Sequence, residues 1–174
     1  MNQKVILVTG ASRGIGREIA KTLAKQGNIV IANYKKSEKE AQELQAQLKG
    51  FGCEIEIFRC DVSKREEVQK MINFVIDQYG RIDVLVNNAG IDDEKMFVDI
   101  TDEDWNYVMQ NNIYSVFCCT QEVVKYMINQ KSGCIVNISS IYGVSGGSCD
   151  VHYSVSKAGI NGMTKALAKE LRTV

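Results

Sequence analysis

The chain has 174 residues, in which 21 lysines and arginines balance 21 aspartates and glutamates. This length predicts one domain with a substantial core, and the zero net charge gives no bulk attraction to nucleic acid or to an anionic membrane. The six cysteines show no metal-binding spacing and there is a single histidine, so we expect no metal site. The cysteines are expected to be reduced thiols. No apolar run reaches transmembrane length and a strand pattern begins at once, which predicts a cytoplasmic protein.

Short β-branched runs alternate with amphipathic stretches along the chain. We expect strands over residues 4–10, 28–34, 54–60, 82–88 and 133–139. Helical patterns fill the intervals, a longer one spans about 101–130, and the last runs from near Tyr153 to Leu171. Continuous apolar strands that are each followed by a helix indicate a parallel sheet covered on both faces. With right-handed crossovers, the sequence predicts one doubly wound α/β domain over residues 1–174.

The first expected strand ends in TGASRGIG, residues 9–16. Glycines at positions 10, 14 and 16 would let the backbone turn tightly and approach a pyrophosphate at the N-terminus of the next helix. Ligands of doubly wound sheets bind beyond the carboxyl ends of the strands, which is where this turn lies. We therefore expect a dinucleotide site here; the alternative is a tight turn that binds nothing.

A second candidate site is HYSVSK, residues 152–157. Lys157 follows Tyr153 by four residues, so on a helix the ammonium and the phenol share one face. Such pairs also occur on solvated helices, so the spacing alone does not establish a function.

The order of these motifs resembles that of the short-chain dehydrogenase/reductase family over the whole chain. The matching residues are TGASRGIG at 9–16, NNAG at 87–90, Asn112, Ser140, Tyr153 and Lys157. The resemblance implies a nicotinamide-dependent oxidoreductase with a Rossmann-type fold. It favours Ser140 over Ser139, because Ser140 precedes Tyr153 by the family's 13 residues, and Asn112 over Asn111.

The resemblance also implies a role for each catalytic residue. Tyr153 would donate or accept the substrate proton, Lys157 would activate it, and Asn112 would anchor a proton-relay water. The charge of Lys157, with an oxidised nicotinamide nearby, would stabilise the Tyr153 phenolate. Ser140 would donate to the substrate oxygen as negative charge develops there. His152 is expected to be packed or solvated rather than catalytic.

Cofactor contacts carried over from the family involve Gly10, Ser12, Arg13, Gly14, Ile15, Gly16, Asn33, Tyr34, Lys35, Asp61, Val62, Asn88, Ala89, Gly90, Tyr153 and Lys157. Asp61 would bind the adenine amino group; the alternative is an N-cap of the next helix, which Ser63 could provide instead. Asn87 and Asn88 would brace the glycine-rich turn near the ribose, or form a plain asparagine turn.

The end of the second expected strand, ANYKK at 32–36, bears on the choice of cofactor. An acid there would hold the ribose 2′-hydroxyl of NAD, but the first acid is Glu38. Arg13 and Lys35 can instead meet a 2′-phosphate. The pattern therefore predicts NADP(H) rather than NAD(H); the alternative is that the lysines are only solvated.

Within the family the chain is similar to bacterial 3-oxoacyl-acyl-carrier-protein reductases, which implies a carrier-bound ketone substrate and fatty acid biosynthesis. Its loop at 143–154, GVSGGSCDVHYS, resembles that of elongation factor P 5-aminopentanone reductases, so a small-molecule or protein-borne ketone is an alternative. A third possibility is a nucleotide-binding or assembly module without catalysis. The helices over about 107–130 and from 153 carry apolar residues around much of their girth. Family members pair these helices across a two-fold axis, so the resemblance implies a homodimer or homotetramer. Family members continue with two more strands, so we expect the 174 residues to be C-terminally incomplete.

Overall fold

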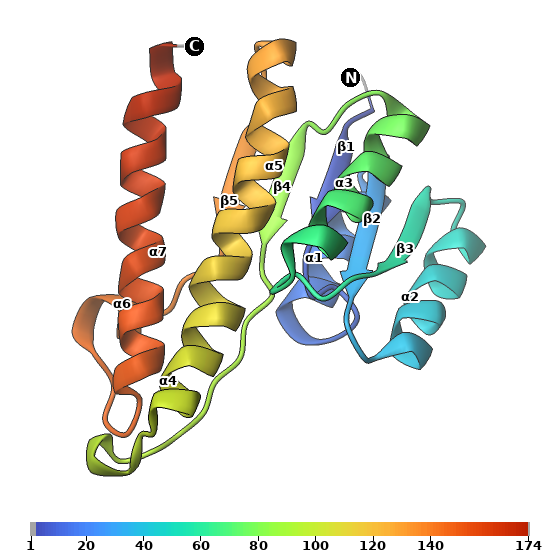
Figure 1. Ribbon diagram of the computed structural model, residues 1–174. Coiled ribbons are helices and arrows are strands. Elements are labelled where there is room, and N and C mark those ends of the chain that lie inside the picture. The colour runs from blue at the N-terminus through green and yellow to red at the C-terminus, as the bar shows by residue number, and fades with distance from the viewer. Residues whose placement is uncertain (1–2, 174) are drawn as a thin grey trace.

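A five-stranded parallel sheet forms the centre of the computed structural model, which describes residues 3–173 (Figure 1). Its strands are β1 (Val5–Val8), β2 (Ile29–Tyr34), β3 (Ile55–Arg59), β4 (Val84–Asn87) and β5 (Cys134–Asn137), in the order β3-β2-β1-β4-β5. All neighbouring strands run parallel. The chain moves outward from β1 to β3 and then returns to β4, so the carboxyl ends of β1 and β4 form the switch point where ligands bind in such sheets.

The helices are α1 (Gly14–Lys25), α2 (Glu38–Gly50), α3 (Arg65–Tyr79), α4 (Asp102–Met109), α5 (Ser115–Gln130), α6 (Tyr142–Ser145) and α7 (Val151–Glu170). Two further single turns of 3-10 helix are η1 (Phe97–Asp99) and η3 (Leu171–Thr173). Alternate residues of β1 point to opposite faces of the sheet, and each face has its own buried core. One core joins Val5 and Leu7 to α3 and α5, and the other joins Ile6 and Val8 to α1 and α2. The predicted doubly wound α/β fold is therefore confirmed.

The long helix expected over about 101–130 is interrupted. A capping box between Thr101 and Asp104 starts α4, and a π-helical segment, η2 (Gln110–Tyr114), then separates α4 from α5. Single π turns inside helices are frequent at functional sites. This one contains Asn112, whose side chain is completely buried.

The last helix begins earlier than the sequence pattern indicates. It starts at Val151 and follows α5 along the edge of the molecule (Figure 1). His152 consequently lies inside the first turn of α7, where it is completely buried, so of the two expected environments, packed or solvated, it has the packed one. All six cysteines are free thiols, and Cys60, Cys118 and Cys119 are buried. No helix among the described residues is both long enough and apolar enough to span a bilayer.

Candidate active site

The turn between β1 and α1 depends on glycine at three positions. Gly10 and Gly14 adopt left-handed backbone angles, with φ of 63° and 56°. A Cβ atom on Gly16 would lie 2.4 Å from the carbonyl oxygen of Gly10, so no larger residue fits there. The α1 N-terminus carries no side-chain cap and no acid in its first turn. Its free N–H groups therefore suit an anionic pyrophosphate.

Asn33 of β2 and Asn88, the first residue after β4, hydrogen-bond to the backbone of this turn. Asn33 Oδ1 accepts a hydrogen bond from Gly10 N at 3.1 Å, and its Nδ2 donates to Cys60 O at 3.0 Å. Asn88 Nδ2 donates to the carbonyl oxygens of Thr9 (2.9 Å) and Gly10 (3.1 Å). The bracing contact expected of Asn88 is thus present. Asn33 is buried, so it shapes the turn rather than lining its open side.

Thr9 also braces the site, which the sequence reasoning missed. Its Oγ1 accepts hydrogen bonds from the backbone N–H groups of Asn88 and Ala89, both at 3.0 Å. The hydroxyl therefore joins the end of β1 to the loop after β4. In the sequence, the only signal for this role was the position of Thr9 between a buried strand and the first glycine of the turn.

The remaining expected cofactor contacts divide by exposure. Arg13, Gly14 and Ile15 are exposed at the start of α1, whereas Ser12, Tyr34 and Val62 are buried. The Arg13 guanidinium makes no hydrogen bond or ion pair among residues 3–173. A cation is therefore free to meet a phosphate beside the glycine-rich turn.

Lys35 and Asp61 form an ion pair that the sequence did not predict, with Nζ and Oδ2 2.9 Å apart. Ser63 donates to Asp61 Oδ1 through its backbone N–H (3.1 Å) and its hydroxyl (2.6 Å). Burial raises the pKa of Asp61, but the Ser63 hydroxyl and the Lys35 ammonium outweigh it, so the pKa lies below the ordinary value. Lys64 occupies the N-cap position of α3, so Asp61 does not cap that helix.

Tyr153 and Lys157 lie on one face of α7, as the sequence predicts for residues four apart. The Lys157 Nζ atom is 5.5 Å from the centre of the Tyr153 ring and donates to Ile138 O at 3.0 Å. The lysine is only 5% exposed. Burial lowers the pKa of its ammonium group, and the negative charge of Asp92 acts in the opposite direction. A buried cation is thus held beside the phenol.

The two serines after β5 differ in what their hydroxyls do. Ser139 Oγ donates to Lys157 O at 3.2 Å, so its proton is engaged by α7. Ser140 Oγ accepts from Tyr142 N at 3.2 Å, and its proton has no acceptor among residues 3–173. The Tyr142 ring meets the Tyr153 ring edge-on, with centroids 6.4 Å apart. Ser140 is therefore the serine that can donate to a substrate near Tyr153.

Asn112 fastens the loop after β4 to the helices. Its Oδ1 accepts from Ile91 N and its Nδ2 donates to Ile91 O, both at 2.8 Å, and Nδ2 also donates to Ser156 Oγ at 3.1 Å. These contacts engage both Oδ1 and Nδ2 of the side chain, so a relay water would have to bind Asn112 through a group other than these two atoms. A Cβ on Gly90 would lie 3.2 Å from Asn112 Oδ1 and 3.5 Å from Lys157 Nζ, so glycine lets this loop pass close to Lys157.

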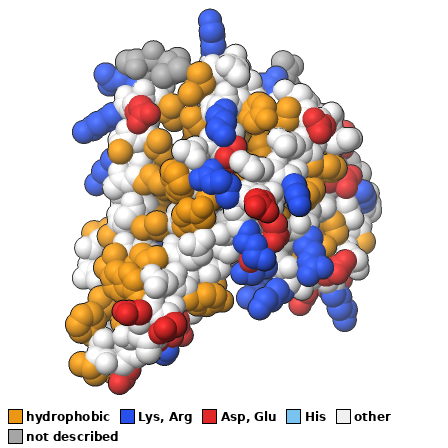
Figure 2. Space-filling view, in the orientation of Figure 1, with side chains coloured by type: hydrophobic (Ala, Val, Ile, Leu, Met, Phe, Trp, Pro, Cys, Tyr) orange, Lys and Arg blue, Asp and Glu red, His pale blue; other side chains and the backbone are white. Residues whose placement is uncertain are grey.

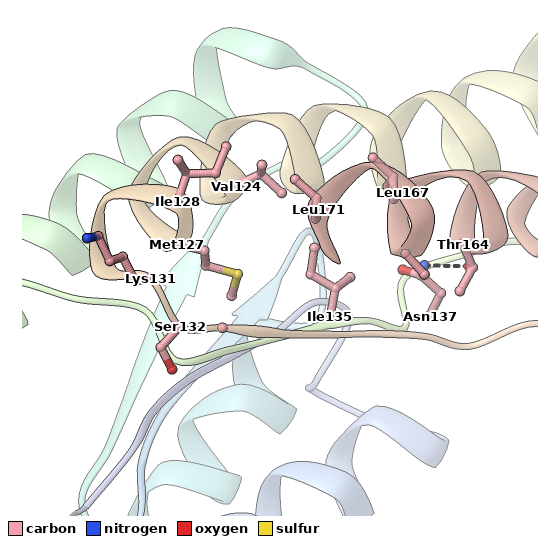
Figure 3. A pocket seen from close by; sticks show the side chains of 12 residues that line it. Val124, Met127, Ile128, Lys131, Ser132, Ile135, Asn137, Thr164, Leu167 and Leu171 are labelled. Carbon is pink, nitrogen blue, oxygen red and sulfur yellow. Dashed lines mark hydrogen bonds between the residues drawn. The ribbon is translucent and has the colours of Figure 1, made fainter. Parts of the chain in front are cut away.

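A hollow of about 370 Å³ lies between α5, β5 and α7, and it is lined by other residues of these elements (Figure 3). Met127, Ile135 and Leu167 line it, and Asn137 Nδ2 donates to Thr164 Oγ1 at its edge, 2.8 Å away. None of the expected catalytic residues lines this hollow. The site that combines the glycine-rich turn with Tyr153 and Lys157 is the one suited to chemistry.

Comparison with known proteins agrees with this arrangement. The family model for short chain dehydrogenase matches residues 4–174. A Staphylococcus epidermidis protein named 3-oxoacyl-[acyl-carrier-protein] reductase FabG is 42% identical over 168 residues, which cover 97% of this chain and 69% of the relative. A Synechocystis protein named 3-oxoacyl-[acyl-carrier-protein] reductase is 43% identical over 171 residues, covering 98% and 69%. The matched region includes both the glycine-rich turn and the Tyr153–Lys157 pair.

Proposed function

Because the chain belongs to the short-chain dehydrogenase family of NAD(P)-dependent oxidoreductases, which act on hydroxyl and carbonyl groups, we propose that it is an NADPH-dependent ketoreductase. The observation that carries this proposal is the buried Lys157 ammonium held 5.5 Å from the Tyr153 ring centre. Burying an ammonium group is costly unless it is paired or hydrogen-bonded, and Lys157 Nζ has one hydrogen-bond acceptor among residues 3–173, Ile138 O, so the structure keeps this cation beside the phenol at a cost. The same pair argues against a nucleotide-binding module without catalysis.

The cofactor fits the described residues. The glycine-rich turn and the uncapped start of α1 would hold the pyrophosphate, and Arg13 would meet the 2′-phosphate. Lys35 is held by Asp61, so it would reach the phosphate only by sharing that ion pair. Asp61 has both carboxylate oxygens engaged and would bind the adenine amino group through its remaining lone pairs. NADPH supplies a hydride to the carbonyl carbon when bound.

The chain's own residues supply the proton and the polarisation. Tyr153 would donate its phenolic proton to the developing alkoxide, and the Lys157 charge would stabilise the phenolate that remains. Ser140 would donate its free hydroxyl proton to the same oxygen. Ile138 O and Ser139 hold Lys157 and its backbone in place. Asn112 keeps the neighbouring loop against the lysine.

For the substrate, a carrier-bound 3-oxoacyl group is the first candidate, because the relatives carry that name. A different ketone, small or protein-borne, is the second candidate. It is favoured by the three consecutive acids at 92–94, which follow the loop that passes over Lys157. We also propose that the chain acts as a single domain in a cytoplasmic homodimer or homotetramer.

Replacing Tyr153 with phenylalanine tests the chemistry. We expect NADPH oxidation with a ketone substrate to fall by roughly 10²–10⁴-fold, because general acid catalysis is lost. NADPH binding, followed by fluorescence titration, should change little, because the hydroxyl acts on the alkoxide. Tyr142→Phe is the matched control, since the Tyr142 ring adjoins Tyr153 but its hydroxyl has no assigned part. Near-normal hydride transfer by Tyr153→Phe would show that another group supplies the proton.

A further inference from the structure

The π-helical segment η2 directs three consecutive polar side chains to different parts of the site. Gln110 Nε2 donates to Ser63 O at 2.7 Å, and Asn111 Oδ1 accepts from Lys35 Nζ at 3.5 Å. Asn112, the next residue, fastens the loop after β4 and donates to α7. Segment η2 lies where α4 joins α5, with the ends of β2 and β3 on one side and α7 on the other (Figure 1). It therefore touches both halves of the site.

On the side of β2 and β3, the contacts close a ring around Asp61, the residue expected to bind the adenine amino group. Asp61 Oδ1 accepts from the N–H and the hydroxyl of Ser63, whose carbonyl oxygen accepts from Gln110. Asp61 Oδ2 is paired with Lys35, whose ammonium also donates to Asn111. Figure 2 shows acidic and basic side chains side by side on the face where α3 begins, directly after this ring in the chain. Each carboxylate oxygen of Asp61 is thus one residue away from η2.

The ring fixes the direction in which Asp61 can accept a further hydrogen bond. A carboxylate accepts along lone pairs that lie in its own plane, so its orientation decides where a donor can bind. Ser63 holds one oxygen and Lys35 holds the other. The Gln110 side chain is exposed, and its bond to Ser63 is its only hydrogen bond among residues 3–173. Holding this ring in place is therefore the one structural task of that side chain.

The π turn itself is held by defined hydrogen bonds. Ser115 N donates to Gln110 O, five residues earlier, whereas an α-helical bond would reach only four residues back. The carbonyl oxygen that is left over, Asn111 O, accepts from the Ser115 hydroxyl at 2.6 Å. Coupling between sites is carried by contiguous hydrogen bonds and rigid backbone of this kind. A displacement of Gln110 can thus pass along the turn to Asn112.

We propose that Gln110 is a positioning residue for the cofactor, which orients Asp61 through Ser63. We propose further that η2 transmits occupation of the adenine site to the loop after β4, because Asn112 continues the same turn. Binding of the adenine amino group would restrain Asp61 and the ring, and the loop that passes Lys157 would then be held more firmly. The proposal rests on the cofactor site proposed above, but it does not depend on which ketone is reduced.

The test uses adenosine 2′,5′-bisphosphate, which carries the adenine and the 2′-phosphate but has no nicotinamide to place near Lys157. We expect Gln110→Met to weaken its binding, measured by calorimetry, by about 3- to 10-fold, as for the loss of one hydrogen bond. Methionine keeps the length of the side chain and removes only the donor to Ser63 O. Asn106→Leu, one turn earlier on α4, is the matched control. Asn106 is exposed and its side chain makes no hydrogen bond among residues 3–173, so fragment binding should not change.

Hydrogen exchange of the Ile91 amide, followed by NMR, gives a second readout. This N–H donates to Asn112 Oδ1 and exchanges only when the loop opens. A saturating concentration of the fragment should slow its exchange in the unmodified chain by about fivefold or more, as for coupled sites. In Gln110→Met, also saturated, the slowing should be largely lost. A purely structural role of Gln110 would instead change the exchange equally with and without the fragment.

The outcomes separate this proposal from the ketoreductase function. Unchanged fragment affinity in Gln110→Met would overturn the positioning role and leave the reductase standing. Exchange at Ile91 that does not respond to the fragment in the unmodified chain would overturn the link through η2. The expected shifts in a chain that reduces no ketone would support the proposal and refute the reductase. Failure of the unmodified chain to bind the fragment would overturn both this proposal and the cofactor site.

Discussion

Replacing Asn112 with alanine would remove the fastening between the loop after β4 and α7. The Asn112 side chain is completely buried and makes three hydrogen bonds, two to the backbone of Ile91 and one to Ser156 Oγ. Each contributes about 1 kcal/mol net, so we expect a loss of about 3 kcal/mol in the free energy of unfolding. That is a large share of the roughly 5–15 kcal/mol that holds a domain together.

The assay is urea denaturation of the whole chain, followed by circular dichroism. A loss of about 3 kcal/mol corresponds to a fall of about 6–12 °C in Tm for a chain of this size. Asn111→Ala is the matched control, because Asn111 is partly exposed and its Nδ2 donates only to Tyr107 O, at 2.9 Å. The control should lose about 1 kcal/mol or less. If both variants lose the same stability, Asn112 does not fasten the loop as argued.

Two further predictions concern charged groups. Arg13→Ala should reduce the preference for NADPH over NADH by about tenfold or more, measured by fluorescence titration, because the guanidinium is exposed beside the glycine-rich turn and makes no hydrogen bond or ion pair among residues 3–173. Equal binding of both cofactors by the unmodified chain would refute the assignment. Burial lowers the pKa of Lys157 below 10.5, against the opposing charge of Asp92, so the folded chain releases this proton at lower pH than the unfolded chain. The stability of the unmodified chain relative to Lys157→Met should therefore rise as pH increases toward 10.5, and a flat difference between about pH 8 and about pH 11 would contradict it.

The sheet was predictable because buried parallel strands are continuous apolar runs. The expected strand at 82–88 is observed as Val84–Asn87, and the one at 28–34 as Ile29–Tyr34. Apolar periodicity could not reveal η2, because one π turn shifts the pattern by a single residue within a long helix. The start of α7 could have been predicted from the sequence, because Asp150 is of a residue type that favours the N-cap position.

The candidate site was predictable as a set of residues but not as a set of contacts. The Lys35–Asp61 pair forms because β2 and β3 are neighbours in register, with Tyr34 opposite Arg59. That register follows from the sheet order, which local sequence does not contain. The same holds for Thr9 and Asn88, which meet because β1 lies beside β4. Their roles, and those of the catalytic residues, remain predictions until the variants are measured.

One short segment after β4 connects every part of the site. Asn87 Nδ2 donates to Asn137 Oδ1 at 2.8 Å, and Asn88 supports the glycine-rich turn. Gly90 then passes Lys157, and Ile91 is fixed by Asn112. Consecutive residues of this segment therefore contact the glycine-rich turn, Lys157 and Asn112, so a shift of the segment at one of these contacts would change its position at the other two. In the proposed reductase, this stretch of backbone would set the spacing between the glycine-rich turn and the Tyr153–Lys157 pair, and Asn112, which holds it in place, is completely buried.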